Sequence, residues 1–186
     1  MPNFRYRLTR TQQRVYDQSN GTSTIPLRAS PRLRAAVAAV PAALAAGDRG
    51  RVEQLAQIAA DEISAALHVG RVRVIVSGTR PSNARGELHG LYTQSPGAAP
   101  TIKLWMLTAK RGQVVAFKTF LRTFLHEICH HLDYTLLRLK DSFHTEGFYQ
   151  RESSLFYRVG GAAAAAAAPL STVAAPRSIR PEASVK

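Results

Sequence analysis

Large apolar residues recur every three or four positions along the stretch of chain from Gln113 to about Leu139. They are Val114, Phe117, Leu121, Phe124, Ile128 and Leu132. This spacing matches the 3.6-residue turn of an α-helix and places all of these side chains on one face. The pattern therefore predicts a long helix with one face buried in a core.

The motif HEICH, an HExxH pattern, lies inside this predicted helix. Residues four apart on a helix have Cβ atoms about 5–6 Å apart, so His126 and His130 can direct ring nitrogens at one ion. Zinc favours imidazole ligands, and with three protein ligands and one open position it lowers the pKa of a bound water to about 7. Glu127 is placed to accept that proton and pass it to a leaving amine. We therefore predict a Zn²⁺ cofactor, His126 and His130 as ligands, and Glu127 as the catalytic base.

A third ligand has to come from further along the chain. The metzincin pattern is excluded, because Asp133 stands where its glycine would be and Leu136 where its third histidine would be. His144 follows a break in the helical pattern at residues 140–142, at the start of the next predicted helix. We predict His144 as the third ligand.

Other side chains near the motif leave alternatives open. Glu146 and Glu152 are the carboxylates that could replace His144 as third ligand. Asp133 shares the helix face of His130 and could orient a ligand through a hydrogen bond. Hydrolysis of an amide also needs a group that stabilises an oxyanion, for which Tyr134 and Tyr149 are the candidates.

Turn-forming residues and alternating patterns predict the elements before the long helix. Pro31 is suited to the first turn of one helix, and Asp48 to the cap of a second that runs from about Arg51 to Leu67. Strands are predicted at residues 71–77, 87–93 and 101–108, the last two as an antiparallel hairpin. A final helix extends to about Val159. The predicted class is α+β, with helices packed on a short antiparallel or mixed sheet.

Composition divides the chain into three segments. Residues 1–30 are basic and polar with a turn-prone Ser-Asn-Gly, which predicts a flexible arm. Residues 31–159 contain the apolar periodicity and are predicted to form one domain. Residues 160–186 begin with an alanine tract and continue with proline and serine, which predicts a disordered tail because few large apolar residues are present to bury.

Positive charge is the strongest bias in the composition. The chain has 25 Lys and Arg against 12 Asp and Glu, a net charge of +13. Such a balance favours nucleic acid or acidic proteins as partners. We predict that arginines of the basic arm contact DNA or an acidic partner through salt-sensitive interactions, namely Arg5, Arg7, Arg10 and Arg14.

Cysteine content and apolar runs bear on the cellular compartment. Cys129 is the only cysteine, so no disulfide forms within the chain and no cysteine-rich zinc ribbon is available. The first residues lack the apolar core of a signal peptide, and the longest apolar run, residues 35–46, is interrupted by Pro41. We expect a cytoplasmic protein without a membrane partner.

The segments LHEICHHLDY and FHTEGFY resemble the minimal zinc peptidases of the SprT-like and minigluzincin type. The resemblance covers about residues 72–159. It implies a small zincin-like core, with HExxH on one helix and, on the next, His144 followed four positions later by the aromatic Phe148. It also implies zinc-dependent hydrolysis of protein or peptide substrates, with the strand before the helix, residues 101–108, binding the substrate backbone by β-augmentation.

Two other functions are compatible with the same residues. One is a basic nucleic-acid-binding protein with a structural zinc site, and the other is an inactive peptidase-like interaction module. Glu127 separates the first from a peptidase, because a closed structural zinc site has four protein ligands and needs no base beside its first histidine.

Overall fold

A three-stranded mixed sheet lies at the centre of the fold in the computed structural model, which describes residues 4–84 and 86–166. The strands are β1 (Arg73–Thr79), β4 (Gly90–Thr93) and β5 (Thr101–Leu107), in the order β1-β5-β4. β5 is parallel to β1 and antiparallel to β4. The predicted α+β class and the predicted hairpin between the last two strands are confirmed.

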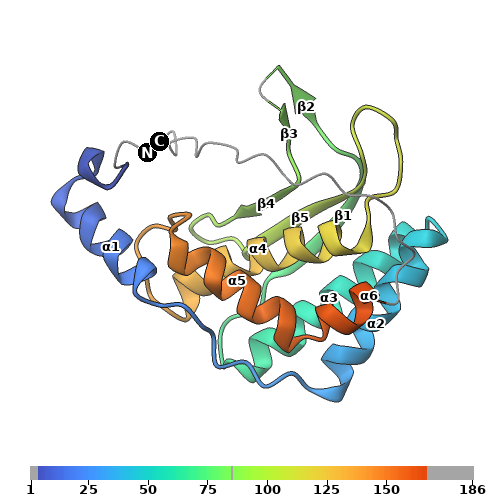
Figure 1. Cartoon of the computed structure of the whole chain (residues 1–186), viewed down its shortest axis with the longest axis horizontal. Coiled ribbons are helices and arrows are strands. Elements are labelled where there is room, and N and C mark those ends of the chain that lie inside the picture. Colours follow the sequence, from blue (N-terminus) through green and yellow to red (C-terminus); the bar gives the residue numbers. More distant parts are fainter. Residues whose placement is uncertain (1–3, 85, 167–186) are drawn as a thin grey trace.

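A short second hairpin projects from this sheet. It is formed by β2 (Ser82–Asn83) and β3 (Gly86–Glu87), which pair antiparallel between β1 and β4 in the sequence (Figure 1). The hairpin extends away from the helices, so it leaves their packing on the sheet undisturbed.

Alternate residues of β1 and β5 point to one face and form the core. Val74, Val76, Ile102 and Leu104 are all nearly inaccessible to solvent. Register pairs Val74 with Ile102 and Val76 with Leu104, so these side chains form adjacent rows under the helices.

The two helices predicted before the sheet are both present. In α2 (Pro31–Ala45) the Ser30 hydroxyl accepts the backbone N–H of Leu33, and Pro31 occupies the first position, where its missing N–H costs nothing. In α3 (Arg49–Ala66) the Asp48 carboxylate accepts the N–H of Arg51 in the same way.

Side chains of α3 close the outer edge of β1. The Gln57 amide donates to the carbonyl of Val72 at 3.0 Å and accepts the N–H of Val74 at 2.7 Å. Glu53 accepts the N–H of Val76 at 2.8 Å. Because these groups occupy the hydrogen-bonding positions of a neighbouring strand, β4 is the open edge of the sheet within the described part of the chain.

This topology corrects one prediction. The strand at residues 101–108 was expected to bind a substrate backbone, but β5 is paired on both sides and has no free edge. Periodicity revealed the hairpin, whereas the parallel pairing of β5 with β1 joins distant parts of the chain and leaves no local signal.

The long helix predicted from periodicity is α4 (Phe117–Thr135), which lies across the sheet and packs against β4, β5 and α5 (Figure 1). Its buried face includes Leu125, Ile128 and Leu132. The next helix is α5 (Glu146–Arg158). Thr145 caps its first turn, because its hydroxyl accepts the N–H of Phe148 at 3.0 Å. Within the described residues, no helix is both long enough and apolar enough to cross a membrane.

Residues 4–30 differ from the predicted flexible arm. They form a 3₁₀ turn, η1 (Phe4–Arg7), and α1 (Arg10–Asn20), which packs against α5. The following extended stretch buries Ile25 and Leu27, each with 1% of its surface exposed. These two residues are isolated among polar neighbours, so no periodicity marked them as part of the core.

The predicted tail also begins in ordered structure. Gly161–Ala166 form α6, which contacts α2 and α5. Alanine has the highest intrinsic helix propensity, which explains a helix where composition alone predicted disorder. The rest of the predicted tail, residues 167–186, lies outside the described residues.

Candidate metal centre

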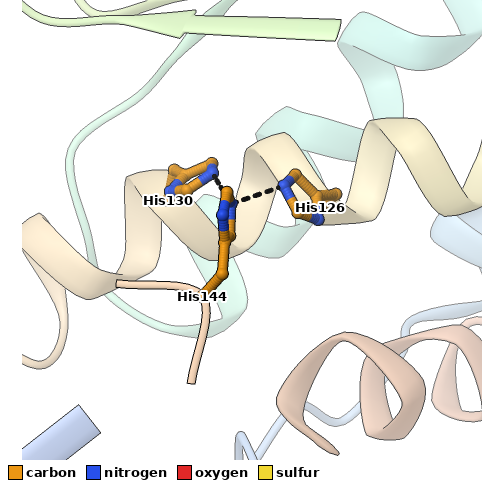
Figure 2. A group of neighbouring side chains, drawn as sticks. All are labelled: His126, His130 and His144. Atoms are coloured by element: carbon orange, nitrogen blue, oxygen red, sulfur yellow. Dashed lines mark hydrogen bonds between the residues drawn. The ribbon is translucent and has the colours of Figure 1, made fainter. Parts of the chain in front are cut away.

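Three histidine side chains converge between α4 and the segment that leads into α5, as Figure 2 shows. The Nε2 atom of His144 lies 2.9 Å from Nε2 of His126 and 3.1 Å from Nε2 of His130. A tetrahedral zinc ion with Zn–N distances of 2.0–2.1 Å holds its nitrogens about 3.3 Å apart. The spacing of the three nitrogens therefore fits a metal ion.

Secondary structure determines this convergence. His126 and His130 are one turn apart on α4, and His144 immediately precedes Thr145, the residue that caps α5. The predicted set of His126, His130 and His144 is thus brought together. Glu146 is exposed and accepts a hydrogen bond from Gln150, so it does not belong to the cluster.

Hydrogen bonds to the remaining ring nitrogens orient two of these histidines. Nδ1 of His126 lies 3.3 Å from the Glu152 carboxylate, and Nδ1 of His130 lies 2.7 Å from the Ser142 hydroxyl. Since the Ser142 hydroxyl donates to Asp133 at 2.7 Å, it is free to accept the Nδ1–H of His130. Both rings then present an unprotonated Nε2 to the centre of the cluster.

Glu152, the alternative third ligand, lies outside the cluster and contacts a histidine ligand instead. Its carboxylate contacts the side of the His126 ring that faces away from the cluster, and it also accepts from Arg122 at 3.3 Å. Asp133, predicted to orient a ligand, reaches His130 through Ser142. Ser142 was not singled out in the sequence, because a serine in a short connection carries no distinctive signal.

Two of the three histidines, His130 and His144, are suited to metal binding because they resist protonation. Burial, followed by the neighbouring His126 and His144, holds the pKa of His130 well below its usual value. Burial, with a further contribution from His126, lowers the pKa of His144 to about 4. Both imidazoles are consequently neutral at pH 7, the form in which histidine binds metals.

Glu127 lies beside the cluster, buried between α4 and the edge strand β4, with 5% of its surface exposed. Burial raises the pKa of its carboxyl to about 7, although nearby His126 and a hydrogen bond to the backbone of Tyr92 act in the opposite direction. A carboxyl with this pKa exchanges protons readily near neutral pH.

Gly90 allows β4 to approach Glu127 so closely. A Cβ atom at this position would lie 2.5 Å from Oε1 of Glu127 and 2.7 Å from Cγ2 of Thr123. The sequence did carry a signal for this residue, because a glycine within a strand pattern often marks a close backbone approach.

Two tyrosines and a further histidine lie near the motif in the sequence. Tyr149 has its ring centroid 6.0 Å from that of His144 and is half exposed, so it borders the cluster. Tyr134 instead stacks on Tyr92, with centroids 5.9 Å apart. His131, which follows the motif directly, is buried and contacts the carbonyl of Gly70 at 2.8 Å, so it is a packing residue.

Comparisons of the chain with protein-family models, with curated proteins and with solved structures found no match. The function of the protein therefore has to be inferred from the chemistry of this site. Within the described residues, the cluster that could hold a metal ion contains three histidines and no fourth His, Cys, Asp or Glu. Three nitrogen donors with one position left over match an open zinc site better than a closed one.

The burial of Glu127 predicts a pH-dependent effect of Glu127→Gln on the metal-free protein. The pKa of about 7 exceeds the ordinary 4.5, so the folded protein resists ionisation and loses stability relative to the variant as pH rises through this window. As the pH rises from about 5 to 8, the free energy of unfolding of the variant should increase by about 2–3 kcal/mol relative to that of the wild type. Denaturant unfolding at both pH values measures this, and a difference that does not change with pH would contradict it.

Proposed function

We propose that this protein is a zinc-dependent peptidase in which His126, His130 and His144 hold the ion and Glu127 is the general base. The observation that carries the proposal is the convergence of three imidazole nitrogens next to a buried carboxyl whose pKa is about 7. Zinc bound by three such ligands lowers the pKa of a coordinated water to near neutrality.

Glu127 supplies the proton transfers of this reaction. Its pKa of about 7 lets it accept a proton from the attacking water and later donate it to the leaving amine at neutral pH. Glu127 follows the first histidine but points about 100° around the helix from it, which favours a role in proton transfer over metal coordination. The ring of Tyr149 borders the histidines and is the better placed of the two candidate oxyanion donors.

The open edge of β4 provides a site for an extended substrate. Peptides that bind enzymes often add a strand to an exposed sheet edge. β4 lies against α4 and touches Glu127 through Gly90, so a chain paired with β4 would pass close to the general base. We infer a zincin-like core of the SprT-like and minigluzincin type, with β4 in the role that the resemblance alone would have given to β5.

Gly90→Ala tests the close approach of β4 to the base. The added Cβ would meet the Glu127 carboxylate and displace it or the strand. Since misplacement of a catalytic group by about 1 Å can cost roughly 100-fold, turnover should fall by up to that factor while zinc stays bound. Gly78→Ala in β1 is the matched control, because a Cβ there meets nothing within 4 Å. Equal turnover in the two variants would argue against this arrangement.

A structural zinc site in a nucleic-acid-binding protein has less support. The site lacks a fourth protein ligand among the described residues, and Cys129 is buried away from it in the helix. The basic N-terminal residues remain a proposed contact for DNA or an acidic partner. Arg5 is bound to Asp17 by two hydrogen bonds, which leaves the exposed Arg7, Arg10 and Arg14 for that contact.

Reversible loss of hydrolysis on removal of zinc is the experiment for this function. The protein loaded with zinc should cleave an unfolded protein substrate, a chelator should stop the cleavage, and added zinc should restore it. Cleavage that persists undiminished in the metal-free protein would rule out the proposed role of the three histidines.

A further inference from the structure

The N-terminal helix α1 contacts the segment that carries His144. The hydroxyl of Ser19 lies 3.1 Å from that of Thr145, the residue next to His144, and the Asn20 side chain accepts the N–H of Gly147 at 3.2 Å. A Cβ at Gly147 would lie 2.5 Å from the carbonyl oxygens of both Ser19 and Asn20. The end of α1 and the start of α5 are therefore in direct backbone contact.

A buried arginine extends this contact to the metal centre. Arg151, with 1% of its surface exposed, donates to the carbonyls of Ser19 and Thr22 and to the hydroxyl of Ser19. Its other bond, at 2.8 Å, is to the fully buried carboxylate of Asp133. Nε of Arg151 has no hydrogen-bond partner among the described residues, so this buried charge pair depends on the bonds made by the two terminal nitrogens of Arg151. The carbonyls of the N-terminal segment are therefore part of what keeps it in place.

Asp133 connects Arg151 to a histidine of the cluster through Ser142. It accepts from Ser142 at 2.7 Å, and Ser142 lies 2.7 Å from Nδ1 of His130. An unbroken series of hydrogen bonds thus runs from the end of α1 through Arg151, Asp133 and Ser142 to His130.

Aromatic packing adds a second link on the other side of His144. The ring of Phe143 lies 6.0 Å from Tyr16 in α1 and 6.3 Å from Phe4 in η1, measured between centroids. The residues on both sides of His144, Phe143 and Thr145, are thus held by the N-terminal segment.

From these contacts we infer that α1 is a positioning element of the metal centre, which holds His130 through Arg151, Asp133 and Ser142 and holds His144 through its two neighbours. This inference rests on the proposed zinc site. It gives the N-terminal segment a role in metal affinity, independent of any partner that its arginines bind.

Gly147→Ala in the full-length protein tests this role, because it forces α1 and α5 apart without removing a polar group. Groups that orient metal ligands typically contribute 10–100-fold to affinity, so zinc should bind about 10-fold more weakly or worse, measured by competition with a chromophoric chelator. Gly50→Ala is the matched control. Gly50 is also the second residue of a helix capped by a side chain, and its Cβ would meet only the Asp48 carboxylate at an ordinary 3.6 Å.

Substitutions at two serines separate positioning from folding. Ser142→Ala breaks the link between Asp133 and His130 and should weaken zinc binding by 10–100-fold, whereas Ser142→Thr keeps the hydroxyl and should restore most of it. Ser19→Ala removes one contact of α1 and replaces Gly147→Ala if that variant does not fold. Circular dichroism of the metal-free variants confirms that each remains folded.

The outcomes distinguish this inference from the proposed function. Wild-type protein that binds zinc tightly, with the Gly147, Ser19 and Ser142 variants binding it equally well, would overturn the positioning role alone. Wild-type protein that binds no zinc would overturn both. The expected result is weak zinc binding in Gly147→Ala, Ser19→Ala and Ser142→Ala, with normal binding in Gly50→Ala and near-normal binding in Ser142→Thr.

Discussion

Replacing His144 by alanine is expected to remove tightly bound zinc. The substitution leaves two imidazoles on α4, and the position vacated between them has no other carboxylate, thiol or imidazole in the described cluster to fill it. The loss of affinity should exceed the 10–100-fold typical of groups that only orient a ligand. Metal analysis of the purified variant, followed by chelator competition, measures both occupancy and affinity.

Glu152→Gln is the matched comparison, because it separates the loss of a ligand from the loss of a group that orients a ligand. Glu152 hydrogen-bonds to Nδ1 of His126, on the side of the ring away from the cluster, so its loss should weaken zinc binding without abolishing it. The opposite ranking, with His144→Ala keeping full occupancy and Glu152→Gln losing it, would establish the carboxylate as the third ligand.

The sequence was most informative where local periodicity and chemistry coincide. The apolar repeat predicted α4, the four-residue spacing of His126 and His130 placed them on one face, and the break before His144 predicted its position at the start of α5. Each of these inferences depends on residues close together in the chain, where helix geometry fixes the outcome.

The parts that could not be predicted depend on contacts between distant segments. Nothing local indicated that Arg151 would be buried against carbonyls more than a hundred residues earlier, so α1 was expected to be flexible. The edge position of β4 likewise follows from the parallel pairing of β1 with β5 and from Gln57 and Glu53 closing the outer edge of β1. A single sequence holds no signal for such pairings beyond the residues that take part.

The largest effect on catalysis is expected from Glu127→Gln. Glutamine matches glutamate in size and can still contact the backbone of Tyr92, but it cannot accept a proton from a zinc-bound water. The three histidines remain unchanged, so the variant should keep its zinc. Turnover should fall by about 10²–10⁴-fold, the range for losing a positioned general base.

Glu146→Gln provides the control for this substitution. Glu146 is exposed near the site and hydrogen-bonds only to Gln150 among the contacts described, so the same change of charge there should leave turnover close to that of the wild type. A comparable loss in both variants would indicate that net charge near the histidine cluster, rather than proton transfer by Glu127, limits the reaction.

The most direct measurement is the rate at which new amino groups appear in an unfolded protein substrate, recorded side by side for wild-type protein and Glu127→Gln, each loaded with one equivalent of zinc. The account predicts steady cleavage by the wild type and a rate at least about 100-fold lower for the variant at equal zinc occupancy. Zinc bound equally by both proteins, with no cleavage by either across a broad range of protein and peptide substrates, would contradict the peptidase and favour a structural metal site.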